Sequence, residues 1–204
     1  LAYKFDGSGN FQLWAPSDPG YNPSNLYRNS LAEYFLPSVD EWYKAAYFDP
    51  NAGVYYVYPT GSNSVPDGID FPGDSNFDAV FNDGVFNIDP NDITNVGVLS
   101  PYGTAGQGGN MYEWEETDFD LLNDSVSSSS ARVFRGGFWN GDSSDSLASL
   151  RLNGFPTFEN FALGFRVAST ADIPEPSTAL LGGLASVGVL LRRRWLGIKK
   201  RGEH

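Results

Sequence analysis

The side chains that could do chemistry in this chain are of few kinds. Its 204 residues contain no cysteine, and the single histidine is His204. A thiol nucleophile, a disulfide framework, a zinc cluster and a histidine-based triad are therefore excluded for this sequence. General acid or base chemistry would depend on carboxylates, on tyrosines, or on Lys4 and Lys44.

Acidic side chains dominate most of the chain, and basic ones dominate its end. Residues 1–173 hold seven Lys/Arg and 23 Asp/Glu, a net charge of -16, whereas residues 174–204 hold six Lys/Arg and two Asp/Glu, a net charge of +4. The acidic residues 1–173, which we call the body, repel phosphate backbones, so we expect no nucleic-acid partner. The same charge could attract Ca²⁺ or a cationic partner, or could form an ordinary solvated face.

The C-terminal segment has three consecutive parts. An apolar run, 178–191, would span about 21 Å as a helix, less than the hydrocarbon core of about 30 Å, so its length alone allows a buried helix or a membrane segment. A rigid entry and a basic stop favour the membrane segment, with the basic end on the cytoplasmic side. The flanking residues are Pro174, Glu175 and Pro176 before the run and Arg192, Arg193 and Arg194 after it.

This order of parts resembles the PEP-CTERM sorting signal of exported bacterial proteins. For residues 172–204 the resemblance implies export, transient anchoring in the inner membrane through a short apolar helix, and recognition and cleavage by an exosortase-type processing enzyme. The protein would then reside at the cell surface or in the extracellular matrix; a plain anchor that is never cut is the alternative. The residues after Leu1 lack the basic start and apolar stretch of a secretory signal, so we expect an N-terminal part to precede them.

The elements that must position any site are short. Aromatic residues make up 15% of the chain and can supply a core, but 23 Gly and 13 Pro interrupt it, which predicts a loop-rich α+β fold. Residues 36–50 predict a helix of about three turns, because Ser38 and Glu41 form a capping box and Asp49-Pro50 ends the pattern. Its expected buried face holds Trp42, Ala45 and Ala46.

The remaining elements are expected to be strands and one long loop. Residues 54–63 and 132–140 each predict a strand, and residues 162–170 predict a closing strand. Between them, residues 64–95 are mostly Asn, Asp, Gly and isolated Phe. A loop of this length is usually functional or held by another group, and a bound cation would serve.

Four stretches in this order resemble the formylglycine-generating enzyme, or sulfatase-modifying factor, family: "LPSVDEWYKAA", "GGNMYEW", "RVFRGGFWN" and "LGFRVA". They extend over about 135 residues. The resemblance implies that residues 1–171 are a partial domain of this family, truncated at its N-terminus. It also implies a C-type-lectin-like variant of the fold, with little regular secondary structure.

The resemblance also indicates where family chemistry should lie. Active members present two cysteines that bind copper and oxidise a substrate cysteine. Alignment on "RVFRGGFWN" places these positions at Gly141 and Ser146, and neither side chain can bind copper as a thiolate. We therefore expect neither bound copper nor formylglycine formation.

Calcium is the one cofactor that the resemblance leaves open. A first family site would use the backbone oxygens of Gly109 and Met111 and the carboxylate of Glu113. Gly106 stands where the family has an Asn or Asp ligand, and water could replace that ligand. Glu113 could equally form a structural salt bridge.

A second family calcium site would use Asn76 and the backbone at Phe77. Asp89 or Asp92 could supply the acidic ligand, and the spacing does not decide between them.

The arginines of the body are expected to serve the scaffold rather than a substrate. The planar fork of arginine suits buried carboxylates, so Arg135, Arg151 and Arg166 are the expected partners of acids such as Glu41 and Glu113.

Together these features predict an exported, non-catalytic binding or structural module that holds a glycan or a matrix protein. One alternative is an enzyme of different chemistry, such as a carboxylate-based glycan hydrolase, although no pair among the 23 acids stands out. The other is copper-dependent cysteine oxidation with ligands from the missing N-terminal part.

Overall fold

The computed structural model describes residues 2–5, 7, 11–84, 89–123 and 130–170. The chain divides into two units between Ser169 and Thr170, and all the described helices and strands belong to the first. The predicted sorting signal and its apolar helix, 172–204, lie outside the described residues. Within the described ranges, no helix has the length and apolar character needed to cross a bilayer.

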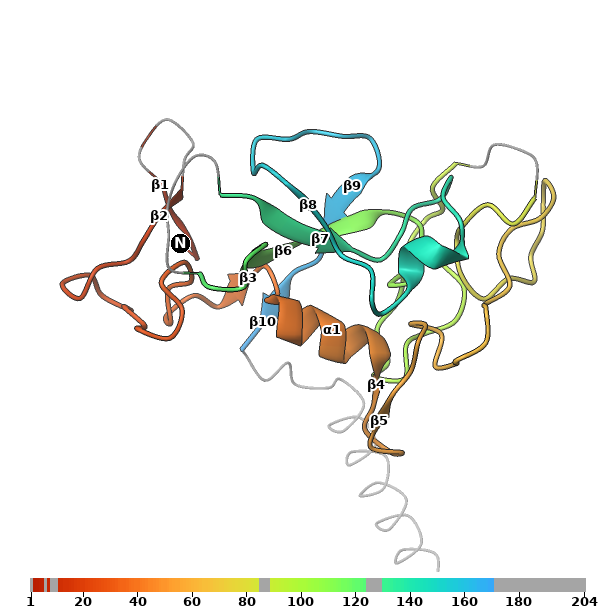
Figure 1. Cartoon of the computed structure of the whole chain (residues 1–204), viewed down its shortest axis with the longest axis horizontal. Coiled ribbons are helices and arrows are strands. Elements are labelled where there is room, and N and C mark those ends of the chain that lie inside the picture. The colour runs from red at the N-terminus through yellow and green to blue at the C-terminus, as the bar shows by residue number, and fades with distance from the viewer. Residues whose placement is uncertain (1, 6, 8–10, 85–88, 124–129, 171–204) are drawn as a thin grey trace, which may run out of the picture. The chain divides into compact units, whose positions relative to one another are not determined.

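A four-stranded sheet of order β8-β7-β6-β9 forms the centre of the first unit (Figure 1). β7 is antiparallel to β6 and β8, whereas β9 is parallel to β6. Paired residues share a face, so Trp114, Phe134 and Phe165 lie on one face and Glu113 and Arg135 on the other. The strands are β6 (Tyr112–Asp118), β7 (Arg132–Arg135), β8 (Leu152–Gly154) and β9 (Leu163–Phe165).

The helix α1 (Val39–Tyr47) covers the Glu113 face of this sheet. Its capping box is present as predicted: the Ser38 hydroxyl accepts from the Glu41 amide, and the Glu41 carboxylate accepts from the Ser38 amide. Trp42 and Ala46 are buried as expected, and Ala45 is half-buried. The helix ends before the predicted stop at Asp49-Pro50, because its last capping residue is extended and begins strand β4 (Phe48–Asp49).

Three two-stranded sheets surround the centre. They pair β1 (Lys4–Phe5) with β2 (Phe11–Gln12), β3 (Tyr34–Phe35) with β10 (Ala168–Ser169), and β4 with β5 (Val54–Tyr55). The prediction of one closing strand over 162–170 was wrong, because this stretch forms β9 and β10 in two different sheets. Arg166 lies between the two strands and binds Glu113.

Backbone pairing and apolar packing hold the long loop after β5. Isolated bridges join Ile69 to Asn82 and Val80 to Gly109, and Ile69, Val80 and Val96 form a buried cluster. No helix or strand occurs in the described parts of 64–95, as predicted. One short 3₁₀ helix, η1 (Ser143–Ser146), follows β7, and the α+β class is confirmed.

Candidate binding site

Strand β6 carries four buried acidic side chains, and each lies beside an arginine. The arginines come from the N-terminal segment, from β7 and from the residue after β9. Each buried negative charge therefore has a nearby cation, as burial of a carboxylate requires. The pairs are Glu113 with Arg166, Glu115 with Arg135, Glu116 with Arg28, and Asp118 with Arg132.

Both carboxylate oxygens of Glu113 are engaged by cationic or N–H donors. Arg166 donates from Nε at 2.5 Å and from Nη2 at 2.7 Å, and the Trp42 indole donates at 2.7 Å. The salt bridge that the sequence left open for Glu113 is present. A calcium ion there would stand next to a guanidinium group, whose positive charge opposes the binding of a cation.

The other residues of the first predicted calcium site form backbone contacts. The Gly109 amide donates to Gly136 at 2.6 Å, and its carbonyl accepts from the Met111 amide at 2.8 Å. Gly106 is buried with a φ of 68°, and a side chain there would press against Ile93. A calcium role for Gly109, Met111 and Glu113 stays a prediction.

The residues of the second predicted calcium site are spread over an exposed loop. Asn76 is exposed, whereas Phe77 packs on the apolar cluster around Val80. Asp89 is also exposed. The Asp92 carboxylate accepts from the amide and hydroxyl of the residue two positions on, and these bonds hold its pKa below the ordinary value. Over the described ranges, no three His, Cys, Asp or Glu side chains gather to hold a metal ion.

The two positions that carry cysteine in active enzymes of the resembled family are filled differently here. A side chain at Gly141 would collide with the Asp145 carboxylate and the Phe138 ring. Ser146 is 1% exposed, its hydroxyl donates to the Ser143 carbonyl at 3.0 Å, and its own carbonyl accepts from a tyrosine hydroxyl. These residues do not fit a copper site, because they offer no thiolate.

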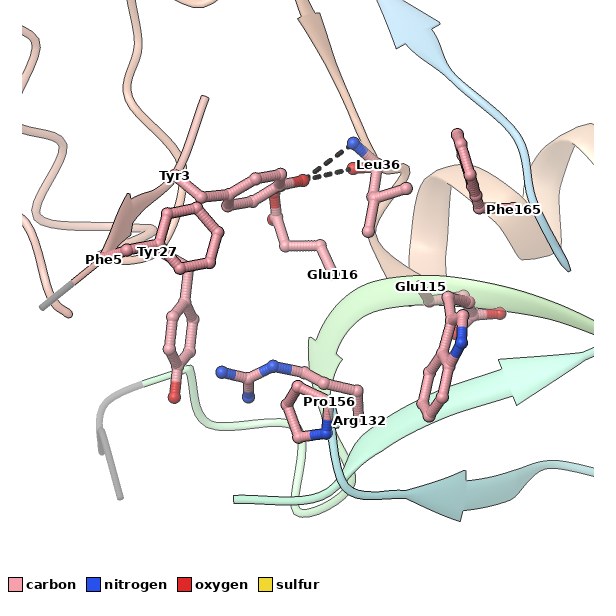
Figure 2. Close-up of a pocket in the computed structure, with 10 residues that line it drawn as sticks. Tyr3, Phe5, Tyr27, Leu36, Glu115, Glu116, Arg132, Pro156 and Phe165 are labelled. Atoms are coloured by element: carbon pink, nitrogen blue, oxygen red, sulfur yellow. Dashed lines mark hydrogen bonds between the residues drawn. The ribbon is translucent and has the colours of Figure 1, made fainter. Parts of the chain in front are cut away.

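A cavity of about 310 Å³ lies on the face of the central sheet that carries Trp114, opposite α1. Figure 2 shows its walls converging from β1, from the segment before β3 and from the central sheet. A register shift in β6 between Trp114 and Asp118 lets two consecutive glutamates reach the lining. The lining residues are Tyr3, Phe5, Tyr27, Leu36, Trp114, Glu115, Glu116, Arg132, Pro156 and Phe165.

The first charged group of this cavity, Glu116, is fully committed to protein partners. Its oxygens accept from Asn25 Nδ2 at 2.5 Å, from Arg28 Nε at 2.7 Å and from the Tyr3 hydroxyl at 3.2 Å. The Tyr3 hydroxyl also accepts from the Leu36 amide at 2.7 Å, as Figure 2 shows. Burial, and then the charge of Glu116, raise the pKa of Tyr3, so this hydroxyl stays neutral.

The second charged group, Arg132, is held in the same way. Its Nη1 donates to Asp118 at 3.1 Å and to the Ser130 hydroxyl at 3.0 Å, and Ser130 donates in turn to Asp118. The guanidinium carbon lies 4.0 Å from the centroid of the Tyr27 ring. Arg132 therefore acts as part of the wall, stacked on an aromatic ring.

Glu115 is the least satisfied of the four acids. Its side chain is completely buried and lies 3.4 Å from Arg135 Nε without a hydrogen bond between them. The other end of Arg135 donates to the carbonyls of Ala148 and Leu150. Burial raises the pKa of Glu115 to about 8, although the positive charge of Arg135 opposes this shift.

Sequence reasoning found one of the four arginine pairs and missed the cavity. We expected Glu41 to pair with Arg135, Arg151 or Arg166, but it binds Arg28 at 2.6 Å. Arg151 lies instead over the Phe119 ring, 4.7 Å from its centroid. Arg28 lies in a stretch for which the sequence predicted no helix or strand, and no local motif connects it to Glu116, which is 88 residues away.

Comparisons with known proteins agree with the motifs. A family model described as "Sulfatase-modifying factor enzyme 1-like domain" matches residues 20–171, and the PEP-CTERM protein-sorting motif matches residues 172–194. Comparison with curated proteins found no relative.

Among solved structures, "Treponema denticola variable protein 1" is similar with a TM-score of 0.51 and 19% identity, over 75% of this chain and 54% of that one. "Crystal Structure of CarF" follows with a TM-score of 0.41 and 17% identity, over 78% of this chain and 56% of that one. The chain thus spans about half the length of each. At these identities the first likeness concerns the fold alone.

Proposed function

This chain belongs to the sulfatase-modifying factor enzyme 1-like family, and from that premise we propose that it is a non-catalytic binding module of the cell surface or extracellular matrix. The matched sorting motif supports an exported, transiently membrane-anchored bacterial protein and implies processing by exosortase-type machinery. The binding role and the final location are the parts that we propose.

The observation that carries this proposal is the state of the two cysteine positions. Copper-dependent oxidation of a cysteine needs thiolate ligands, and Gly141 and Ser146 provide none. The space beside Gly141 is occupied by the Asp145 carboxylate and the Phe138 ring. The fold therefore keeps its scaffold without the groups that the oxidation requires.

The buried acids of β6 give little support to a carboxylate-based hydrolase. Glu113, Glu116 and Asp118 each form a salt bridge with an arginine, and Glu115 is completely buried beside another. A hydrolase needs two carboxylates that face a bound sugar on opposite sides of its bond. Charge-neutralised acids inside the sheet support a structural role instead.

A direct test combines two activity assays on the full chain. The protein is incubated with copper and oxygen and a cysteine-containing peptide, which is then examined by mass spectrometry for conversion of cysteine to aldehyde. In parallel it is incubated with soluble polysaccharides, and reducing sugar is measured. We expect neither product, with a cysteine-containing family enzyme and a known glycosidase as positive controls. Aldehyde formation, or sugar release abolished by a single carboxylate substitution, would overturn the non-catalytic assignment.

The sorting role is tested in cells. Replacing Pro174, Glu175 and Pro176 by alanine is expected to keep the protein in the membrane fraction, whereas the unchanged protein is released from it. Equal release of both forms would contradict processing at this motif.

A further inference from the structure

The cavity on the Trp114 face is the strongest unassigned feature of the described chain. We propose that it binds an uncharged apolar side chain, aromatic or branched aliphatic, carried on a basic segment of a partner protein. This inference rests on the proposed function, because it names the class of partner that the binding module takes.

The walls of the cavity combine buried and exposed rings. Tyr27 is 1% exposed and forms part of the floor, whereas Phe5 and Phe165 are 48% and 67% exposed. Trp114 and Phe165 are direct neighbours in the register of β6 and β9, so their rings stand on the same side. Rings that remain exposed around an open cavity can bury apolar area when a ligand enters, and burial of that area drives binding.

The polar groups of the lining exclude charged ligands as the main occupant. Glu116 already accepts from Arg28 and Asn25, and Arg132 already donates to Asp118 and Ser130. The carboxylate of Glu115, the third charged group of the lining, lies beside Arg135, which is on the opposite face of the sheet. A charged ligand group would therefore lose its hydration without gaining an unused countercharge on this face, which is costly.

Sugars fit the same interior poorly. A sugar ring can stack on aromatic side chains, but its hydroxyls need hydrogen-bond partners once they are buried. In the lining, the Glu116 oxygens already accept from Asn25 and Arg28, and the Tyr3 hydroxyl is already engaged with Glu116 and Leu36. An apolar side chain has no such requirement.

The net charge of residues 1–173 indicates which kind of polypeptide would carry that apolar side chain. Residues 1–173 carry seven Lys/Arg against 23 Asp/Glu. Exposed acids lie close in sequence to the lining, with Glu33 before Leu36 and Glu159 after Pro156. A strongly acidic domain that carries an apolar cavity complements a cationic polypeptide, and it disfavours anionic polymers and anionic lipid headgroups.

The test uses short fluorescein-labelled peptides of Gly, Ser and Lys that carry one central residue, either Trp, Leu or Ala. Binding to the full chain is followed by fluorescence anisotropy. We expect the Trp and Leu peptides to bind about tenfold more tightly than the Ala peptide, because a buried side chain is worth at least that factor. Raising the salt from about 50 mM to about 500 mM should weaken all of them.

Two variants locate the binding. Phe165→Ser is expected to remove the preference for Trp and Leu over Ala, whereas Phe161→Ser should keep it. Phe161 is the matched control, because it is an aromatic residue of the same segment, is 73% exposed and does not line the cavity. Thermal unfolding of both variants shows whether each is folded.

Other outcomes overturn the inference. Equal affinity for the three peptides, or a preference that survives Phe165→Ser, would refute an apolar anchor in this cavity. Binding of a neutral oligosaccharide or of phosphatidylcholine vesicles that depends on Phe165, without peptide binding, would assign the cavity to another ligand class. Either result leaves the non-catalytic assignment standing, because that assignment fails only if aldehyde or sugar is produced.

Discussion

Among the ion-paired lysines and arginines outside the central sheet, Arg28 should be the one whose replacement by methionine lowers the free energy of unfolding most. The Arg28 side chain is 14% exposed and that of Glu116 is 0% exposed, so the substitution leaves a buried carboxylate without its cation. Breaking such a pair costs about 3 to 5 kcal/mol. Asn25 and Tyr3 still donate to Glu116 in the variant, so we expect a cost at the lower end of this range. Loss of the half-exposed Glu41 pair adds at most about 1 kcal/mol, so we expect about 3 to 4 kcal/mol in total.

The assay is urea unfolding at pH 7, followed by tryptophan fluorescence, with Lys4→Met as the matched control. Lys4 binds Asp18 at 2.7 Å, but both side chains remain partly exposed, at 35% and 24%. This pair should contribute less than about 1 kcal/mol. A cost of Arg28→Met no greater than that of Lys4→Met would refute the reasoning.

A second variant keeps the test informative if Arg28→Met does not fold. The double variant Arg28→Met/Glu116→Gln removes the uncompensated charge while keeping a hydrogen-bonding side chain of similar size. It should be about 1 to 3 kcal/mol more stable than Arg28→Met alone. A double variant no more stable than the single one would show that the loss comes from packing of the arginine stem.

Three further predictions follow from buried groups and from one glycine. The pKa of Glu115 is about 8 in the folded chain and about 4.5 when unfolded, so its contribution to stability is complete below pH 4.5 and is lost as the pH rises to 8. Glu115→Gln should therefore remove a decline in the free energy of unfolding on the order of 5 kcal/mol over this pH range, measured by urea unfolding, and parallel pH profiles would contradict this. Glu113 is already bound by an arginine and an indole. Adding about 5 mM calcium should therefore shift the unfolding midpoint of the wild type and of Glu113→Gln equally. A shift in the wild type alone would establish the calcium role. Gly109→Ala should lower the free energy of unfolding by at least about 2 kcal/mol more than Gly103→Ala does. Both glycines have positive φ, but only at Gly109 would a Cβ collide with the Val80 carbonyl. Equal midpoints in thermal unfolding would disprove this.

Local sequence patterns were sufficient to predict local structure such as the start of a helix. The Ser38 and Glu41 capping box predicted the start of α1, because each partner lies within one helical turn of the other. The pairing of Glu113 with Arg166 was among the expected combinations, because the planar fork of arginine suits a buried carboxylate. Only the capping box depends on a spacing that can be read along the chain.

Contacts between distant segments could not be read in this way. Nothing near Arg28 indicates that it reaches Glu116 and Glu41, because these contacts depend on how the segment before β3 packs against β6 and α1. The register shift after Trp114 also has no sequence signal, although it brings two consecutive glutamates to the cavity lining. The cavity is therefore a property of the assembled fold.

The four acids of β6 also have a consequence for the order in which the domain assembles. Two of the four arginines that bind them come from distant parts of the chain: Arg28 precedes Glu116 by 88 residues, and Arg166 follows Glu113 by 53. The strand cannot be buried without uncompensated charge until both ends of the domain have arrived, so the last step should be concerted and slow. A chain exported from its N-terminus would deliver Arg166 only just before the sorting motif, and until then β6 should remain a solvated, negatively charged segment that resists premature collapse and aggregation.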